Sequence, residues 1–178
     1  MLKRILIALV LLVVIVLGYA ATKPDSFHFE RTAVIATTPE KLYPYLTDLK
    51  LGGQWNPYEQ KDPSMKKTFS GAESGTGAVM DFEGNGDVGA GQLEVVQATP
   101  SSQVDLKLRM RKPFEGEQDI HYKISPDEGG TRFTWAMSGR QSFFMKLISV
   151  FIDCEKMFTN EMDKGIANLQ AIFPGDKR

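Results

Sequence analysis

The chain has 178 residues, of which 42% are hydrophobic and 24% charged, as expected for one globular domain with an appendage. Its net charge of −1 leaves no basic surplus to neutralise a phosphate backbone, which argues against nucleic acid as a partner. The single cysteine, Cys154, cannot form an internal disulfide, so cysteine usage does not distinguish a reducing from an oxidising compartment.

The first 22 residues have the composition of a membrane-spanning or signal segment. Lys3 and Arg4 precede an uninterrupted apolar run at residues 5–17, and the next charged residue is Lys23. The uncharged stretch 5–22 would form a helix of roughly 27 Å at about 1.5 Å per residue, close to the ~30 Å hydrocarbon core of a bilayer.

Two interpretations of this segment remain open. In the first, Lys3 and Arg4 stay in the cytoplasm, and the segment is an uncleaved anchor in the cytoplasmic membrane with the C-terminal domain outside. In the second, residues 18–20, Gly-Tyr-Ala, form a signal-peptidase site and the domain is secreted. The anchor is favoured because the apolar run lacks a strong Ala-x-Ala sequence. Both interpretations export the domain, which we place at residues 27–173.

The domain begins with a predicted strand and a short helical pair. Residues 27–35 alternate imperfectly between apolar and polar, which indicates a strand. Thr38 is suited to a helix N-cap, and the proline after it is suited to the first helical position. Pro44 keeps this helix short, and residues 48–53 supply another turn before the loop that carries Trp55.

The middle of the chain predicts consecutive strands without intervening helices. Apolar and polar residues alternate without a break at 104–110, and the pattern recurs at 120–124 and 133–137. The Asn-Gly pair at 85–86 is a strong hairpin signal between two further runs. We therefore expect an antiparallel sheet of about seven strands with one covered face.

The apolar period then changes to that of a helix. Apolar residues at spacings of three, four or seven predict one amphipathic helix of about 30 residues, from near Ser142 to near Ile172. Lys146 falls on its polar face and Cys154 on its apolar face, while Gly165 permits a close backbone approach or a slight bend. Together the elements predict an α+β domain in which a curved sheet wraps around the long C-terminal helix.

Several local sequences resemble a known superfamily. Residues 31–42, RTAVIATTPEKL, resemble its first strand running into its first helix, and residues 55–58, WNPY, resemble the loop after the helical pair. The glycine-rich stretches at 69–78 and 84–91 resemble its central hairpin, and residues 129–135, GGTRFTW, resemble its last strand. In these positions the domain is similar to the START-like (SRPBCC) superfamily, in particular its polyketide cyclase/dehydrase-like subgroup. The resemblance implies the helix-grip fold but no single function, because the superfamily includes lipid carriers, hormone receptors and cyclases.

Three patterns that often mark chemical sites have structural interpretations here. Residues 84–89 match the dinucleotide-binding pattern G-x-G-x-x-G, but a strand rather than a helix is expected after them, so we interpret them as a hairpin. His28 and His121 each sit between apolar neighbours on a strand and should point away from the covered face, which favours neither metal binding nor histidine catalysis. Cys154 is expected to be a buried, inert thiol. We therefore expect no metal or cofactor and assign no catalytic residue.

Arg31 shares the parity of the apolar positions in the first strand, so an unbulged strand would direct it inward. There its guanidinium would pair with a carboxylate or with an anionic group of a ligand; alternatively it snorkels to water or a bulge turns it outward.

The resemblance implies an internal apolar cavity, because a helix-grip sheet usually encloses more volume than its side chains fill. Its methionines and aromatic residues would suit a flat or chain-like apolar ligand. The expected lining residues are Arg31, Trp55, Tyr58, Met80, Phe82, Met110, Tyr122, Trp135, Met137, Phe151 and Phe158.

Three functional hypotheses follow. The favoured one is a non-enzymatic, membrane-tethered domain that binds a lipid or another hydrophobic small molecule in this cavity. The alternative is a cyclase/dehydratase-like enzyme acting on an apolar substrate, which requires at least two ionisable groups facing the cavity; Arg31 and Tyr122 are the candidates. The third is an interaction domain with a filled interior.

Overall fold

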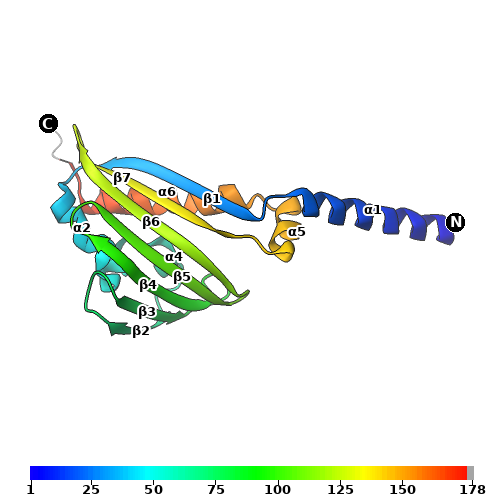
Figure 1. The fold of residues 1–178 in the computed structure, drawn as a ribbon, viewed down its shortest axis with the longest axis horizontal. Helices are drawn as coiled ribbons and strands as arrows, with labels where there is room; N and C mark the ends of the chain where they lie inside the picture. The colour runs from blue at the N-terminus through cyan, green and yellow to red at the C-terminus, as the bar shows by residue number, and fades with distance from the viewer. Residues whose placement is uncertain (176–178) are drawn as a thin grey trace.

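Seven antiparallel strands form one sheet in the computed structural model, which describes residues 1–175 (Figure 1). The strand order across the sheet is β1-β7-β6-β5-β4-β3-β2, so each neighbouring pair is joined in sequence except β1 and β7. This confirms the predicted α+β, helix-grip architecture. The strands are β1 (Ser26–Ile35), β2 (Lys66–Gly71), β3 (Ala78–Glu83), β4 (Ala90–Thr99), β5 (Gln103–Lys112), β6 (Gly116–Asp127) and β7 (Gly130–Arg140).

The helices lie in four groups. The apolar helix α1 (Leu2–Thr22) extends away from the domain, and α6 (Cys154–Ile172) packs along β1. The predicted helical pair after β1 is one helix, α2 (Pro39–Thr47), followed by three shorter segments. These are η1 (Leu49–Leu51), α3 (Gly52–Trp55) and α4 (Pro57–Lys61), and a further helix, α5 (Phe143–Phe151), follows β7.

Strand registers define two poles of the domain. At one pole, which we call the anchor pole because the predicted anchor α1 leaves the domain there, the start of β1 pairs with the end of β7, Ser26 opposite Arg140. The β5–β6 turn lies close to α5 at this pole. At the far pole lie the β2–β3 loop, the β4–β5 turn and α2, where the amide of Gly75 donates to the carbonyl of Thr47 at 3.0 Å. Figure 1 shows α1 leaving the domain at the anchor pole, opposite α2.

The glycine-rich stretch 84–89 is a hairpin connection between β3 and β4, as predicted. The Asn85 side chain accepts hydrogen bonds from the backbone amides of Asp87 and Val88, at 2.9 and 3.2 Å. Strand β4 follows directly, so no helix N-terminus is present here to receive a pyrophosphate.

The predicted length of the C-terminal helix, about 30 residues, is wrong. The long helix is α6, with 19 residues, and α5 is a separate helix of nine residues. Between them Ile152 has an extended backbone (φ −120°, ψ 130°), and the Asp153 carboxylate accepts a hydrogen bond from the Lys156 amide at 3.0 Å. The chain therefore turns at Ile152 and starts a new, capped helix.

Two side chains consequently lie on sides opposite to those predicted. Lys146 was expected at the solvent face, but it is buried, and its ammonium group reaches out to the exposed Asp25 carboxylate just before β1. Phe151 was expected in the cavity, but it lies at the end of α5 and is 73% exposed. The break leaves Phe151 outside the interior that α6 covers.

Gly165 lets α6 approach the sheet closely. A Cβ atom at this position would lie 2.7 Å from the Trp135 ring and 3.1 Å from the Pro57 ring. The absence of a side chain thus allows α6 to rest directly on β7 and α4, as the sequence suggested, and the helix runs through Gly165 without interruption.

We expect Gly165→Ala to lower the free energy of unfolding by about 1 kcal/mol or more. Overpacking of a close contact costs about 1–3 kcal/mol, which exceeds the gain in helix propensity of up to ~1 kcal/mol. Urea unfolding of the detergent-solubilised chain, followed by tryptophan fluorescence, measures the change. Gly53→Ala is the matched control, because its Cβ would meet only ordinary contacts at 3.6 Å or more. Equal stability of the two variants would contradict the close packing.

Candidate functional site

Four aromatic side chains form the centre of the interior between the sheet and the helices. The Trp55 ring packs edge-on against Tyr122, Phe133 and Trp135, with centroid distances of 5.8, 6.4 and 5.5 Å. All four residues are at least 97% buried. Edge-to-face contacts of this kind add to the energy of apolar burial and fix the orientation of each ring.

Trp55 belongs to the short segment α3, and hydrogen bonds of its indole ring and of its backbone carbonyl hold it in place. Its indole N–H donates to the carbonyl of Tyr45 in α2 at 2.9 Å. Its own carbonyl accepts from the Asn168 side chain in α6 at 3.0 Å. Trp55 therefore connects the wall formed by α2 and α3 to the helix that covers the sheet.

A small inner pocket lies beside this cluster. Its volume of about 20 Å³ is room for roughly one water molecule. The lining combines apolar core residues with polar groups, and these come from the helical segments after β1 and from β4, β5 and β6. It comprises Tyr45, Leu46, Asp48, Leu49, Gly52, Trp55, Asn56, Glu59, Leu93, Leu106 and Tyr122.

Glu59 supplies a buried carboxylate to the inner pocket. Its side chain is 4% exposed and pairs with the Lys67 ammonium of β2 at 2.5 Å. The carboxylate packs against the backbone of Gly52, where a Cβ atom would collide with it. Glycine at position 52 thus makes room for the Glu59–Lys67 pair.

The Tyr122 hydroxyl is the second ionisable group of the pocket. Burial raises its pKa above the ordinary value, and the nearby charges of Glu59 and Tyr58 act in the same direction. Tyr122 is therefore a neutral phenol that can donate or accept a hydrogen bond inside the pocket.

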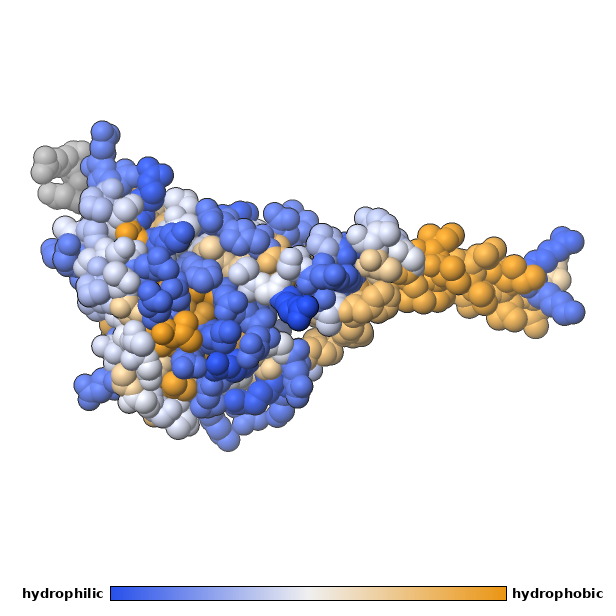
Figure 2. All heavy atoms as spheres, in the orientation of Figure 1, coloured by the Kyte–Doolittle hydropathy of each residue, from blue (hydrophilic) through white to orange (hydrophobic). Residues whose placement is uncertain are grey.

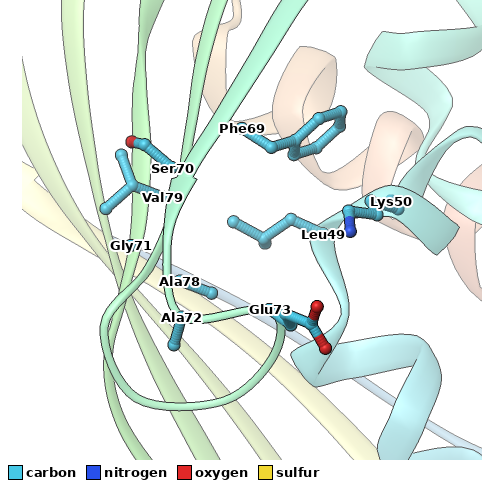
Figure 3. A pocket seen from close by; sticks show the side chains of 9 residues that line it. All are labelled: Leu49, Lys50, Phe69, Ser70, Gly71, Ala72, Glu73, Ala78 and Val79. Carbon is cyan, nitrogen blue, oxygen red and sulfur yellow. The ribbon is translucent and has the colours of Figure 1, made fainter.

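An outer pocket of about 180 Å³ opens at the far pole, between η1 and the β2–β3 loop. Leu49 projects from η1 toward the strands, with the Phe69 ring beside it (Figure 3). Leu49 lines both pockets and is 7% exposed. The outer pocket and the inner pocket are thus adjacent, and Leu49 is part of the wall between them.

A second buried charge cluster joins α4 to α6. Glu161 is buried and pairs with Lys61 at 3.1 Å and Lys164 at 2.9 Å. Burial alone would raise the pKa of Glu161, but the hydrogen bonds from the two lysines together outweigh it and lower the pKa. Tyr58 packs beside this cluster with the Lys61 ammonium 5.2 Å from its ring centre, and burial raises its pKa.

Two buried polar atoms have no hydrogen-bond partner within residues 1–175. They are the indole nitrogen of Trp135 and one carboxylate oxygen of Glu161. A buried polar group normally has a partner, so each is a position where water or a polar atom of a ligand would be stabilised.

The predicted cavity residues fall into three groups. Trp55, Met80, Phe82, Tyr122, Trp135 and Met137 are buried in the core, and Tyr58, Met110 and Phe158 are partly buried. Phe151 is outside, as described above. Whether the interior residues contact a ligand stays a prediction, and the pockets are smaller than the enclosed volume that the fold implies.

Arg31 follows the predicted parity and faces α6, where it pairs with a carboxylate. Its Nε lies 3.2 Å from Asp163, and a second guanidinium nitrogen donates to the carbonyl of Glu30 at 2.9 Å. The side chain is 39% exposed, so the pair lies at the rim of the interface between β1 and α6.

Glu59, Lys67 and Leu49 were not identified from the sequence. The Asn-Pro pair at 56–57 signals the start of α4, with the Asn56 side chain accepting from the Tyr58 amide, and this start places Glu59 in the first turn. No local pattern shows that the carboxylate turns inward, because that depends on Lys67 eight residues later and on Gly52.

The histidines and the cysteine are placed as predicted. His28 is exposed, and His121 lies on the outer face of the sheet with its Nδ1 2.7 Å from the Asp105 carboxylate. Cys154 is buried, and burial raises the pKa of its thiol. No group of three or more potential metal ligands occurs within residues 1–175.

A known protein family matches most of the chain. The sequence profile of the polyketide cyclase/dehydrase and lipid transport family matches residues 26–173. The chain belongs to this family. The match covers the whole sheet and α2 to α6, but not α1. No curated protein sequence matches the chain significantly.

Solved structures share the fold of this family member at low sequence identity. Protein CV1439 from Chromobacterium violaceum is 13% identical with a TM-score of 0.59, over 86% of this chain and all of its own. Protein MLL2253 from Mesorhizobium loti is 18% identical with a TM-score of 0.57, over 82% and 98% of the two chains. Ara h 8.0201 is 12% identical with a TM-score of 0.58, over 83% and 97%. Likeness at this level concerns the fold alone.

Proposed function

We propose that this protein binds a lipid or another hydrophobic small molecule between its sheet and helices, while α1 tethers the domain to a membrane. The observation that carries the proposal is the pair of adjacent pockets separated by Leu49. The family description, which includes lipid transport, agrees with it.

Ligand entry requires the wall at η1, α3 and α4 to move outward, because the inner pocket holds about one water molecule. This wall consists of helical segments of three to five residues. Such short segments gain little stability from their own backbone hydrogen bonds and depend on tertiary contacts. Moving Leu49 aside would connect the outer pocket to Tyr122 and to the apolar side chains of Leu93 and Leu106.

The polar groups of the interior suit a ligand with one polar end. Tyr122 offers a hydroxyl at the inner pocket, and the unpartnered Trp135 N–H and Glu161 oxygen lie buried in the core. An apolar chain with a single hydroxyl or carbonyl group would satisfy one of them and bury its remaining surface against the aromatic cluster.

The membrane tether is α1, a helix of 21 residues that is long and apolar enough to cross a bilayer. Its last turn packs against α5 of the domain. Ala20, the residue before the possible cleavage position, lies in this turn and is fully buried. This packing supports the anchor over the cleaved signal peptide. The charges of Lys3 and Arg4 orient it with the domain on the extracytoplasmic side.

Photo-crosslinking with a clickable fatty acid in living cells tests the binding proposal. We expect the full chain to be crosslinked in peptides that line the inner pocket, such as those containing Leu106 and Tyr122, in addition to α1. Leu49→Trp fills the wall between the pockets and should remove the interior crosslinks while leaving those in α1. Val96→Trp, at a position 41% exposed, is the matched control and should behave like the parent chain. Crosslinks confined to α1 and α5 in the parent would refute the proposal.

The enzymatic alternative has a specific observation in its favour, since Glu59 and Tyr122 both face the inner pocket. The two groups differ from the expected pair, because Arg31 lies at the rim of the α6 interface. A cyclase or dehydratase would leave product on the parent chain and unreacted substrate on Tyr122→Phe. Chromatography and mass spectrometry of the co-purified ligand separate the two functions. The same compound from both chains indicates binding alone, an isomer of equal mass but different retention time indicates cyclisation, and a loss of one water molecule indicates dehydration.

A further inference from the structure

In helix α5 the one charged residue is buried and the phenylalanines are exposed, which is the reverse of the usual arrangement in a surface helix. Its sequence, FFMKLISVF, contains one charged residue, Lys146, which is 6% exposed. Its phenylalanines Phe143, Phe144 and Phe151 are 51%, 49% and 73% exposed. A surface helix of a water-soluble domain normally buries its phenylalanines and exposes its lysine.

Several contacts hold Lys146 and its helix at the junction with α1. Its ammonium pairs with Asp25, and the carbonyl of Asp25 accepts from the Gln141 amide at 2.8 Å. The Lys23 ammonium donates to the carbonyl of Ser149 in α5 at 2.6 Å. These contacts fix α5 to the segment between α1 and β1, with its phenylalanines directed outward.

Other apolar side chains extend this exposed surface. The Phe114 ring, from the β5–β6 turn, lies 5.0 Å from the Phe144 ring and is 49% exposed. Ile152 and Met157, which follow α5, are 51% and 49% exposed. We call this surface the apolar collar; it comprises Phe114, Phe143, Phe144, Phe151, Ile152 and Met157.

The position of the collar along α1 indicates what covers it. The uncharged part of helix α1, residues 5–22, is roughly 27 Å long at ~1.5 Å per residue, so the ~30 Å hydrocarbon core of a bilayer takes it up entirely when Lys3 and Arg4 stay at the cytoplasmic surface. Helix α5 contacts α1, and Ala20 in the last turn is the buried residue of α1. When α1 spans the bilayer, α5 therefore lies at the level where the hydrocarbon ends. Figure 2 shows the apolar surface of α1 continuing onto the domain at this junction.

We propose that the apolar collar inserts into the interfacial region of the same bilayer that α1 spans. The inference rests on the proposed tether. Helix faces rich in Phe and other apolar residues bind at this depth, and Tyr19 in the last turn of α1, with Lys23 5.6 Å from its ring centre, is of the residue type enriched at the interface. The collar gives the domain a second membrane attachment beside α1. The two attachments together fix the orientation of the domain, with its anchor pole against the membrane.

Quenching of tryptophan fluorescence by brominated lipids tests this arrangement in the full chain, reconstituted in phosphatidylcholine vesicles. Phe151→Trp places a reporter in the collar, and Val96→Trp, at a position 41% exposed near the β4–β5 turn of the far pole, is the control. Wild-type emission from the buried Trp55 and Trp135 is subtracted. We expect the Phe151→Trp reporter to emit at shorter wavelength than the control and to lose intensity with lipids brominated near the headgroup, and the control to be unaffected.

A third reporter separates this proposal from the tether itself. Ile15→Trp lies within α1 and should be quenched by brominated acyl chains if α1 spans the bilayer. Quenching at Ile15→Trp without quenching at Phe151→Trp overturns the collar proposal and keeps the tether. A blue-shifted Phe151→Trp reporter that lipid does not quench, with crosslinking between copies, shows that a second copy covers the collar and also overturns it. No quenching at either position means that the tether has failed, and the collar proposal fails with it.

Discussion

Trp55→Ala is expected to lower the free energy of unfolding by about 3–5 kcal/mol, the usual cost of truncating a large buried aromatic side chain. Trp55 is 3% exposed, contacts three aromatic rings and donates a hydrogen bond to the carbonyl of Tyr45. The substitution removes these contacts, leaves that carbonyl without its donor and enlarges the inner pocket. Collapse of the short segments α3 and α4 into the space would place the loss at the lower end of the range.

Urea unfolding of the detergent-solubilised chain, followed by the fluorescence of Trp135, measures this loss. Val96→Ala provides the comparison, because Val96 is 41% exposed and surface truncations usually change stability by less than about 0.5 kcal/mol. A loss below 1 kcal/mol for Trp55→Ala would show that the aromatic cluster does not hold the wall to the sheet.

The Lys67→Met substitution should cost about 3–5 kcal/mol, because it leaves the buried Glu59 carboxylate without its counter-charge. The side chain of Glu59 is 4% exposed and lies against Gly52, so water has little access to it. The double variant Glu59→Gln/Lys67→Met removes both charges and should recover most of the loss, since a neutral amide is far less costly to bury than an unpaired charge.

A double-mutant cycle over these two positions isolates the interaction from the individual losses. The neighbouring Lys66 is exposed, so Lys66→Met is the matched control and should change stability by less than about 0.5 kcal/mol. If Lys67→Met and the double variant are equally destabilised, the Glu59 carboxylate is not a buried charge and the polar end of the pocket is assigned wrongly.

Local patterns in the sequence predicted the parts of the fold that local interactions determine. The alternation at 104–110 gave strand β5 with Val104 and Leu106 buried, and Thr38 occupies the N-cap of α2. Arg31 faces α6 because parity in an unbulged strand determines which side a residue occupies. Its partner, Asp163, could not be predicted, because it is 132 residues away in the chain.

The break between α5 and α6 was missed because the apolar spacing of a helix continues through it. One contact at the break is distant and one is local: Lys146 pairs with Asp25, 121 residues earlier, whereas the Asp153 carboxylate caps the helix that begins right after it. The same contacts reverse the expected positions of Lys146 and Phe151. Glu59 was overlooked for a similar reason, since its burial depends on Lys67 and Gly52 and not on its own helix.

The outer pocket opens at the far pole, beside the β2–β3 loop, while α1 leaves from the anchor pole. With the anchor pole at the bilayer, as proposed, the ligand would enter and leave the domain on the side that faces away from the membrane. Direct extraction from the supporting membrane would then require a path along the whole length of the sheet. The proposed arrangement instead suits transfer of the ligand to a diffusible carrier that approaches from the aqueous side.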